Sequence, residues 1–380
     1  MKGRTTFAVV ALLVVAAGAY LFQGGTIPVP PTPAAPAPLA PRTSPSSPAI
    51  GVAARSSWYE FYTTNPKYPD DPADHRGGLD ARLVALMDRA QTSLDVADYD
   101  FDLADVADAM ARAKQRGAAV RIVTDTDTLT NTKNEQVQAA FKRLKDAGIP
   151  IVDDGRQAIM HDKFTVADGE WVSTGSWNYT DGDTYRLNNW MGIFASKDLA
   201  VNYAAEFTQM FDHRKFGPGK AKQATNTSLT IGGTPVTTCF APKGNCADLI
   251  ITTINREARQ SIEFMAFSFT HDGIGKAIID KHQAGASVVG VFETTGSQTQ
   301  YSEYGRMKQA GLDVYTDGNP YVMHHKVIIL DGRTVIAGSF NFSANADDDN
   351  DENLLIVEDR DLASAFRTEF ARVLEQAKRK

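Results

Sequence analysis

The sequence has only two cysteines, Cys239 and Cys246, among 380 residues. Two thiols are too few for a four-cysteine zinc site or a disulfide-rich scaffold. Basic residues are also in the minority, with 39 Lys and Arg against 46 Asp and Glu and a net charge of -7. This balance disfavours, without excluding, a protein that binds nucleic acid by neutralising phosphates over a cationic surface.

The sequence also lacks the repeated hydrophobic runs of a multi-span membrane protein, the glycine period of collagen and the polar bias of a wholly disordered chain. Its residues are 43% hydrophobic and 22% charged, which is typical of a globular protein. The length suits one large domain or two medium ones.

One apolar stretch, residues 7–22, follows Lys2 and Arg4 near the N-terminus. A basic start before an apolar core indicates an export signal, yet the stretch is also close to the shortest membrane span, about 17 residues. We therefore predict a signal peptide or a signal anchor over residues 1–25. Residues 26–54 hold nine of the 17 prolines and are expected to form an extended linker. The folded part would lie outside the cytoplasm, secreted or anchored.

Export has a consequence for the two cysteines. In an oxidising compartment, Cys239 and Cys246 are expected to form a disulfide that closes the short loop CFAPKGNC. Two unpaired thiols are the alternative if the chain is not exported.

An internal repeat organises the rest of the chain. Residues 78–125 and 246–293 share a helical pattern, a strand opened by Ser93 or Ser261, a second helix ending in Gly and a second apolar strand. This alternation predicts α/β layering with mostly parallel pairing. Each half opens with an aromatic strand, at 58–64 and 237–242. We predict a first lobe over 55–215, a connector over 216–229 and a second lobe over 230–378.

The same motif, H-x-K-x4-D-x6-G-S-x-N, occurs late in each lobe, and neither copy contains a gap. Six fixed positions match by accident roughly once in 10⁷ to 10⁸ placements, so two copies exclude chance. The first copy consists of His161, Lys163, Asp168, Gly175, Ser176 and Asn178. The second copy consists of His324, Lys326, Asp331, Gly338, Ser339 and Asn341.

The Asp-Gly pair inside each copy predicts a β-hairpin with a two-residue turn. In that register Leu330 pairs with Arg333, and His324 lies opposite Ser339. Because side chains alternate along a strand, the His, Lys, Ser and Asn of each copy would then share one face, while His325 points to the other.

This set of side chains suits a phosphodiester. A Lys ammonium with Ser and Asn donors stabilises the charge that develops on the phosphate oxygens. A neutral imidazole can attack phosphorus, and a second imidazole is needed to protonate the leaving oxygen and then to activate water. Since one lobe supplies a single such histidine, we expect the two lobes to face each other across a pseudo-two-fold axis.

The sequence resembles the phospholipase D superfamily, whose hallmark is this duplicated HKD motif, and the resemblance covers nearly everything after residue 55. It implies an α/β fold with mixed sheets flanked by helices, two similar lobes, one active site between them, no metal or cofactor, and a phosphohistidine intermediate. It also implies that His161 is the nucleophile and His324 the acid and base. Phosphate binding would fall to Lys163, Lys326, Asn178 and Asn341, with Ser176 and Ser339 in support.

One departure from the family pattern bears on the mechanism. Glu352 matches the carboxylate that orients a catalytic histidine, whereas the first lobe has Asn188 and Asn189 there. A histidine held by a carboxylate is the more basic one. If Glu352 serves His324, that residue could be the nucleophile instead, unless Asp181 or Asp183 serves His161.

Several other residues have simpler interpretations. Asp168 and Asp331 stand in the motif with the catalytic set, but an Asp-Gly turn alone explains them. The acidic run from Asp347 to Asp351 lacks the spacing of a calcium loop and is expected to be solvated. The aromatic residues beside the motif asparagines are expected in the core, although they could also line an approach for acyl chains or bases. These residues are Trp177, Tyr179, Phe340 and Phe342.

The motif does not select among phosphodiesters, so three functions remain open. The first is a phospholipase D that releases phosphatidate and a head-group alcohol, which the export signal and acidic composition favour. The second is a non-specific nuclease of the same mechanism. The third is a non-catalytic phosphate-binding surface protein, which two intact motifs disfavour. A monomer is expected, since the duplication already supplies both motifs.

Overall fold

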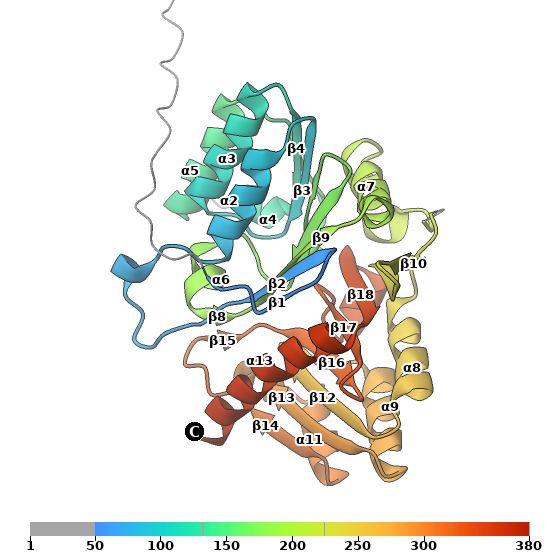
Figure 1. Cartoon of the computed structure of the whole chain (residues 1–380). Coiled ribbons are helices and arrows are strands. Elements are labelled where there is room, and N and C mark those ends of the chain that lie inside the picture. Colours follow the sequence, from blue (N-terminus) through green and yellow to red (C-terminus); the bar gives the residue numbers. More distant parts are fainter. Residues whose placement is uncertain (1–49, 131–132, 224, 380) are drawn as a thin grey trace, which may run out of the picture. The chain divides into compact units, whose positions relative to one another are not determined.

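The computed structural model describes residues 50–130, 133–223 and 225–379. The expected signal or anchor and most of the proline-rich linker lie outside these residues. Both lobes belong to one compact unit, which contains two eight-stranded sheets (Figure 1). No helix within the described ranges is long and apolar enough to cross a membrane.

The first sheet has the order β1-β2-β9-β7-β6-β3-β4-β5. Its strands are β1 (Ala54–Arg55), β2 (Tyr59–Thr63), β3 (Ser93–Asp98), β4 (Ala119–Thr124), β5 (Ile151–Asp153), β6 (Lys163–Ala167), β7 (Trp171–Gly175) and β9 (Trp190–Ala195). Its longer helices are α2 (Leu79–Arg89), α3 (Ala104–Gln115), α5 (Glu135–Asp146) and α7 (Lys197–Phe211). Shorter helices are η1 (Pro72–Asp74), α4 (Thr126–Thr130) and α6 (Asp181–Tyr185).

The second sheet repeats this order as β10-β11-β18-β17-β16-β12-β13-β14. Its strands are β10 (Ser228–Ile231), β11 (Thr234–Ala241), β12 (Ser261–Ala266), β13 (Ser287–Phe292), β14 (Asp313–Thr316), β16 (Lys326–Leu330), β17 (Thr334–Gly338) and β18 (Glu352–Glu358). Its helices are α8 (Cys246–Glu257), α9 (Asp272–Gln283), α10 (Thr294–Ser297), α11 (Glu303–Gln309), α12 (Ala344–Asp348) and α13 (Arg360–Lys378). The turn η2 (Gly217–Gly219) lies in the connector, and β8 (Leu187–Asn188) pairs with β15 (Val322–Met323) between the lobes.

The expected mixed sheets flanked by helices are confirmed, but mostly parallel pairing was wrong. In the first sheet only β3-β4 and β4-β5 are parallel, and the other five neighbouring pairs are antiparallel. The second sheet has the same pattern. Strands joined through a helix pair in parallel, whereas the motif hairpin and the strands beyond it pair in antiparallel fashion.

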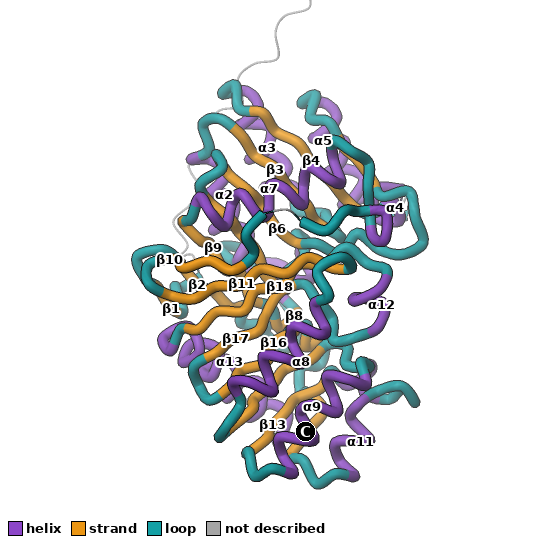
Figure 2. The backbone as a smooth tube through the Cα atoms, turned by 90° about the vertical axis from the view of Figure 1, so that its right-hand side faces the viewer, coloured by secondary structure: helices purple, strands orange, loops and turns teal. Residues whose placement is uncertain are grey.

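The two sheets separate the core into three apolar clusters, each packed against helices. In the first lobe α2, α3 and α5 cover one face of the sheet and α7 covers the other (Figure 1). In the second lobe α8, α9 and α11 cover the outer face and α13 the inner one (Figure 2). The third cluster, which includes Phe61, Trp190 and Phe366, draws buried residues from both lobes. The lobes therefore share a core behind their motif hairpins.

The hairpin register differs by one residue from the expected one. Leu330 pairs with Thr334, not Arg333, and Ala167 pairs with Trp171. The turn holds three residues because Asp331 and Gly332 both adopt positive φ, 52° and 56°, and are followed by an extra residue. As a result Ser339 and Asn341 do not share a strand face with His324; they follow the last residue of β17.

A glycine at the end of each hairpin permits a close approach between strands. A Cβ on Gly338 would lie 2.2 Å from the carbonyl oxygen of Asn353, and a Cβ on Gly175 would lie 2.2 Å from that of Trp190. Backbone atoms cannot yield as a flexible side chain can. Only glycine lets β17 meet β18 at this point.

We predict that Gly338→Ala lowers the free energy of unfolding by about 1–3 kcal/mol, as overpacking does. Gly305→Ala is the matched control, because a Cβ there meets nothing within 4 Å and the residue lies in helix α11. Chemical denaturation of both variants measures the difference. Equal stability of the two would contradict the packing argument.

Candidate active site

Each motif histidine is held by the opposite lobe. His161 precedes β6, and its N–H donates to the carbonyl of Asp351, 2.9 Å away. His324 precedes β16, and its N–H donates to the carbonyl of Asn188 at 3.0 Å. Both side chains are nearly buried, with His161 4% and His324 6% exposed. The two motifs therefore meet at one interface inside the unit.

Glu352 accepts a hydrogen bond from the ring of His161, not from that of His324. The distance from its Oε2 to His161 Nδ1 is 2.8 Å, and the Ser339 hydroxyl donates to the same oxygen at 2.7 Å. The expectation that Glu352 serves the histidine of its own lobe was wrong, because the start of β18 lies beside the segment before β6, where Asp351 forms a bridge with Met160. The bond fixes the tautomer and the orientation of the His161 ring through Nδ1.

The ring of His324 has a partner set from the first lobe. Its Nδ1 lies 3.0 Å from Oδ1 of Asn189 and 3.3 Å from Oδ1 of Asp183. Asn178 donates to the same Asp183 oxygen at 3.2 Å, and Ser176 donates to Asn189 at 2.8 Å. Asp183 therefore belongs to His324, so the alternative in which it serves His161 was wrong as well.

The expected alternative partner Asp181 is also excluded from this role. Its Oδ1 lies 2.9 Å from Nδ1 of His75, on which the ring of Tyr185 stacks. Asp181 is thus engaged outside the motif pair.

Two lysine ammoniums complete the site. Lys163 Nζ donates to the carbonyl of His161 and Lys326 Nζ to that of His324, each at 2.9 Å. Tyr99 lies under Lys163 and Phe267 under Lys326, with 5.2 and 4.6 Å from Nζ to the ring centroid. Each ammonium has further donors that these bonds do not use.

Burial makes both imidazoles neutral. It lowers the pKa of His161 well below its usual value, and the ammoniums of Lys163 and Lys326 lower it further. Burial and Lys326 likewise lower the pKa of His324 to about 3. A neutral imidazole has a free electron pair on one nitrogen, which is the form that attacks phosphorus.

The neighbouring charges respond in a way that favours an anionic ligand. Burial lowers the pKa of both lysines, and the ammonium of Lys163 lowers the pKa of Lys326 further. Burial raises the pKa of Glu352 to about 8, against the pull of Lys163. Burial also acts to raise the pKa of Asp183, but the hydrogen bond from His324 outweighs it and lowers the pKa to about 2. A phosphate between two close ammoniums would relieve their repulsion.

The family described as "Cardiolipin synthase, PLD-like domain" matches the chain twice, over residues 83–211 and 250–374. The chain belongs to the phospholipase D superfamily. A phospholipase D of Rickettsia prowazekii (strain Madrid E) is 32% identical over 160 residues, covering 42% of this chain and 78% of that protein. The human mitochondrial cardiolipin hydrolase is 35% identical over 138 residues, covering 36% of this chain and 55% of that protein.

A solved structure resembles both lobes together. The phosphatidylserine synthase of Haemophilus influenzae Rd KW20 superposes with a TM-score of 0.60 at 12% identity, covering 79% of this chain and 84% of that chain. At this identity the likeness concerns the fold. It agrees with a phospholipase D superfamily fold of two similar lobes.

Asp168 and Asp331 lie at the hairpin turns, away from the motif histidines. Asp331 accepts backbone N–H bonds from residues 259–261, and Asp168 accepts those of residues 91–93. Both lie at the turn, the hairpin end opposite the histidines. The prediction that these two residues belong to the catalytic set was therefore wrong. Each carboxylate instead binds the hairpin turn to the start of the neighbouring strand.

The motif asparagines and serines have divided roles. Ser176 and Ser339 donate to Asn189 and Glu352, the residues whose side chains contact the histidine rings. The side-chain oxygens of Asn178 and Asn341 are buried without a hydrogen-bond partner in the described residues. The phosphate-binding role of the two asparagines stays a prediction.

Sequence reasoning missed the roles of four residues in the site. Asn189 follows Ser176 by thirteen positions, as Glu352 follows Ser339, and this equal spacing was an available signal. Asp183 has no counterpart of its own type in the second lobe. Tyr99 and Phe267 follow β3 and β12, and their rings meet His161 and His324 edge-on at 5.1 and 4.7 Å.

Other expectations were confirmed. His325 points away from the site and contacts Glu369 at 2.9 Å. Cys239 and Cys246 form a disulfide. The four aromatic residues beside the asparagines are buried in the core. The expectation that the acidic run would be solvated was wrong for Asp351, which is buried and accepts hydrogen bonds from Arg156 and from the N–H of Gly217.

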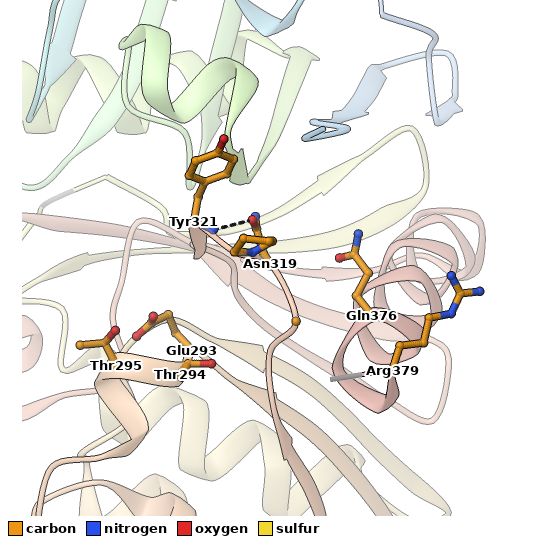
Figure 3. A pocket seen from close by; sticks show the side chains of 9 residues that line it. Glu293, Thr294, Thr295, Asn319, Tyr321, Gln376 and Arg379 are labelled. Carbon is orange, nitrogen blue, oxygen red and sulfur yellow. Dashed lines mark hydrogen bonds between the residues drawn. The ribbon is translucent and has the colours of Figure 1, made fainter. Parts of the chain in front are cut away.

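A pocket of about 510 Å³ lies beside the site without containing it. Its lining includes Glu293, Asn319, Tyr321 and Arg379, but no motif residue (Figure 3). Asn319 donates to the side chain of Asn188 at 2.8 Å, so the pocket adjoins the segment that holds His324.

We predict that Glu352→Gln lowers kcat by about 10²- to 10⁴-fold, because an amide can present N–H to His161 and stabilise the wrong tautomer. Glu358→Gln, at the partly exposed far end of the same strand, is the matched control. Steady-state kinetics at equal folded fraction measure the effect. Wild-type kcat in Glu352→Gln would contradict the orienting role.

We predict that Asp331→Asn lowers stability at neutral pH and leaves kcat per folded molecule unchanged. Burial acts to raise the pKa of Asp331, but the N–H bonds from residues 259–261 outweigh it and lower the pKa below 3.8. The ionised form therefore stabilises the fold above that pH, and the contribution disappears as the pH falls through the folded pKa. The stability gap between wild type and variant should shrink below about pH 4. Denaturation between pH 7 and 2 measures it, with the exposed Asp348→Asn as control.

Proposed function

We propose that this protein is a metal-independent phosphodiesterase of the phospholipase D type, which hydrolyses phospholipid to phosphatidate and the head-group alcohol. The observation that carries the proposal is the pair of neutral, buried imidazoles beside two ammoniums whose remaining donors converge on one interface. That arrangement suits an anionic tetrahedral group that is attacked on one side and leaves on the other.

In the first half-reaction, Nε2 of His161 attacks phosphorus and the bond from phosphorus to the head-group oxygen breaks. Lys163 and Lys326 stabilise the charge on the non-bridging oxygens. The bound anion raises the pKa of His324, which takes up a proton and gives it to the leaving oxygen. The products are a phosphatidyl-His161 intermediate and the free alcohol.

In the second half-reaction, His324 accepts a proton from water as the water oxygen attacks phosphorus. The bond from phosphorus to Nε2 of His161 breaks, so phosphatidate is released and His161 is restored. Glu352 holds Nδ1 of His161 through both steps, and Asp183 with Asn189 does the same for His324. An alcohol in place of water would give a phosphatidyl alcohol.

Several observations support a lipid over a nucleic acid. The chain carries a net charge of -7. This net charge disfavours a polyanionic strand, for which a nuclease presents a cationic channel. The related proteins named phospholipase D and cardiolipin hydrolase also support a lipid substrate.

We also propose that the folded part acts outside the cytoplasm, either secreted or held by an N-terminal anchor. The basic and apolar N-terminus and the proline-rich linker support export. The disulfide between Cys239 and Cys246 fits an oxidising compartment. Alkylation of the protein recovered from each cell fraction tests this, since export predicts no free thiol.

The test of substrate and mechanism offers the full-length chain phosphatidylcholine vesicles, ethanol and single-stranded DNA together, in the presence of EDTA. We expect phosphatidylethanol and phosphatidate to form while the DNA stays intact. His161→Asn and His324→Asn should each lower turnover by roughly 10⁴-fold or more, since the two imidazoles act as one unit. His213→Asn, an exposed histidine outside the motifs, is the matched control.

The contrary outcomes are distinct. DNA fragments with untouched lipid would replace the substrate and retain the mechanism. Turnover that EDTA abolishes, or that survives loss of either histidine, would contradict the mechanism itself.

A further inference from the structure

A single lysine of the connector reaches the base of the site. Lys220 follows η2 and lies outside both segments that match the family, 83–211 and 250–374. It is 4% exposed. Its Nζ contacts Glu206 of α7, the carbonyl of Ala241 at 2.8 Å and Oδ1 of Asp351 at 2.7 Å. The connector thereby joins one element of the first lobe to two of the second.

Asp351 is the residue through which this contact acts on His161. Its side chain also accepts from Arg156 Nη2 at 2.6 Å and from the N–H of Gly217 at 2.7 Å. Its main chain brackets the nucleophile segment, since its carbonyl accepts the His161 N–H and its own N–H donates to Ile159 at 3.1 Å. The next residue along the chain, Glu352, holds the imidazole ring.

The equivalent position beneath His324 is built differently. Asn188 supplies the carbonyl for the His324 N–H, but its side chain is held by the neutral amide of Asn319 at 2.8 Å. The charged clamp thus occurs on the His161 side. Charge-assisted hydrogen bonds are shorter and about twice as strong as neutral ones, so the geometry is more firmly fixed where the nucleophile sits.

The connector is shaped to make this approach. Gly217 has φ of 49°, and a Cβ there would lie 1.9 Å from Nη1 of Arg156 and 2.5 Å from the carbonyl of Asp349. Burial acts to lower the pKa of Lys220, but Glu206 and Asp351 outweigh it and raise the pKa, so the ammonium stays charged.

We propose that Lys220 is a positioning residue for His161: it clamps Asp351 and thereby holds the backbone and, through Glu352, the ring of the nucleophile. The effect on turnover rests on the phosphodiesterase function proposed above. A displacement of about 1 Å at a reacting atom can cost about 10²-fold in rate. The connector is then part of the catalytic apparatus and does more than join the lobes.

The test removes the ammonium of Lys220 together with the carboxylate of its partner Glu206, so that the net charge of the buried cluster is kept. Lys220→Met alone would leave Glu206 and Asp351 against a single Arg156, a change that often unfolds a protein. The double variant Glu206→Gln/Lys220→Met leaves Asp351 paired with Arg156, and Glu206→Gln alone is its reference. Lys222→Met, an exposed lysine two residues along the same connector, is the matched control.

The first readout is kcat and KM of the full-length chain on bis(4-nitrophenyl) phosphate, a small diester that is neither lipid nor nucleic acid. Relative to Glu206→Gln, the double variant should lose about 10- to 100-fold in kcat per folded molecule. Its KM should stay within about twofold, since in the described part of the chain Lys220 contacts Glu206, Ala241 and Asp351 and none of the motif residues. Lys222→Met should behave as wild type.

The second readout is independent of turnover. The His161 imidazole ¹⁵N signals, assigned by their loss in His161→Asn, should shift in the double variant and stay in place in Lys222→Met. If wild type cleaves no diester but these signals shift, the positioning role stands and the proposed function fails. Unchanged ring signals with unchanged kcat per folded molecule, or a rise in KM alone, would overturn the positioning role even if the melting temperature falls.

Discussion

The hydrogen bond between His161 Nδ1 and Glu352 Oε2 crosses from one lobe to the other, and the rest of the site depends on it. It requires β18 of the second sheet to lie beside the segment that precedes β6 of the first. The reciprocal contact of His324 with Asn189 and Asp183 closes the pair. Neither lobe therefore contains a complete active site, although each contains a complete motif. The shared apolar cluster, the paired strands β8 and β15 and helix α13 hold the lobes in this register.

Burial of like charges gives the site its chemical character. Two ammoniums and two imidazoles lie in one interface, where desolvation and mutual repulsion remove the charge from both histidines. The carboxylates that face them, Glu352 and Asp183, contact the Nδ1 atoms of the two rings. The asymmetry between Glu352 and the Asn189–Asp183 pair, together with the charged clamp on Asp351, distinguishes the two histidines. It makes His161 the better fixed of the two, which supports the proposal that His161 is the nucleophile.

Much of this could be predicted from the sequence because the signals are local. The repeat, the hairpins and the identities of His161, Lys163, His324 and Lys326 follow from spacing and alternation. The hairpin register could not be predicted, since positive φ at both Asp331 and Gly332 adds a residue to the turn. The partner of Glu352 depends on how two lobes of separate sequence meet, which no local pattern specifies. The buried contacts of Lys220 could not be predicted for the same reason. A polar, glycine-rich connector has the sequence of a simple linker, and only the structure shows that one of its lysines is buried.

The most direct test of the account is to find which histidine carries the phosphorus. The full-length protein would be mixed with bis(4-nitrophenyl) phosphate, quenched in alkali within one turnover, digested and analysed by mass spectrometry. The account predicts a 4-nitrophenylphosphoryl adduct, formed with loss of one 4-nitrophenolate, on the peptide that contains His161. The adduct should be absent in His161→Asn and retained in a single turnover by His324→Asn at a reduced rate. An adduct on the His324 peptide, or turnover with no adduct on either histidine, would contradict the assignment that the crossed hydrogen bonds imply.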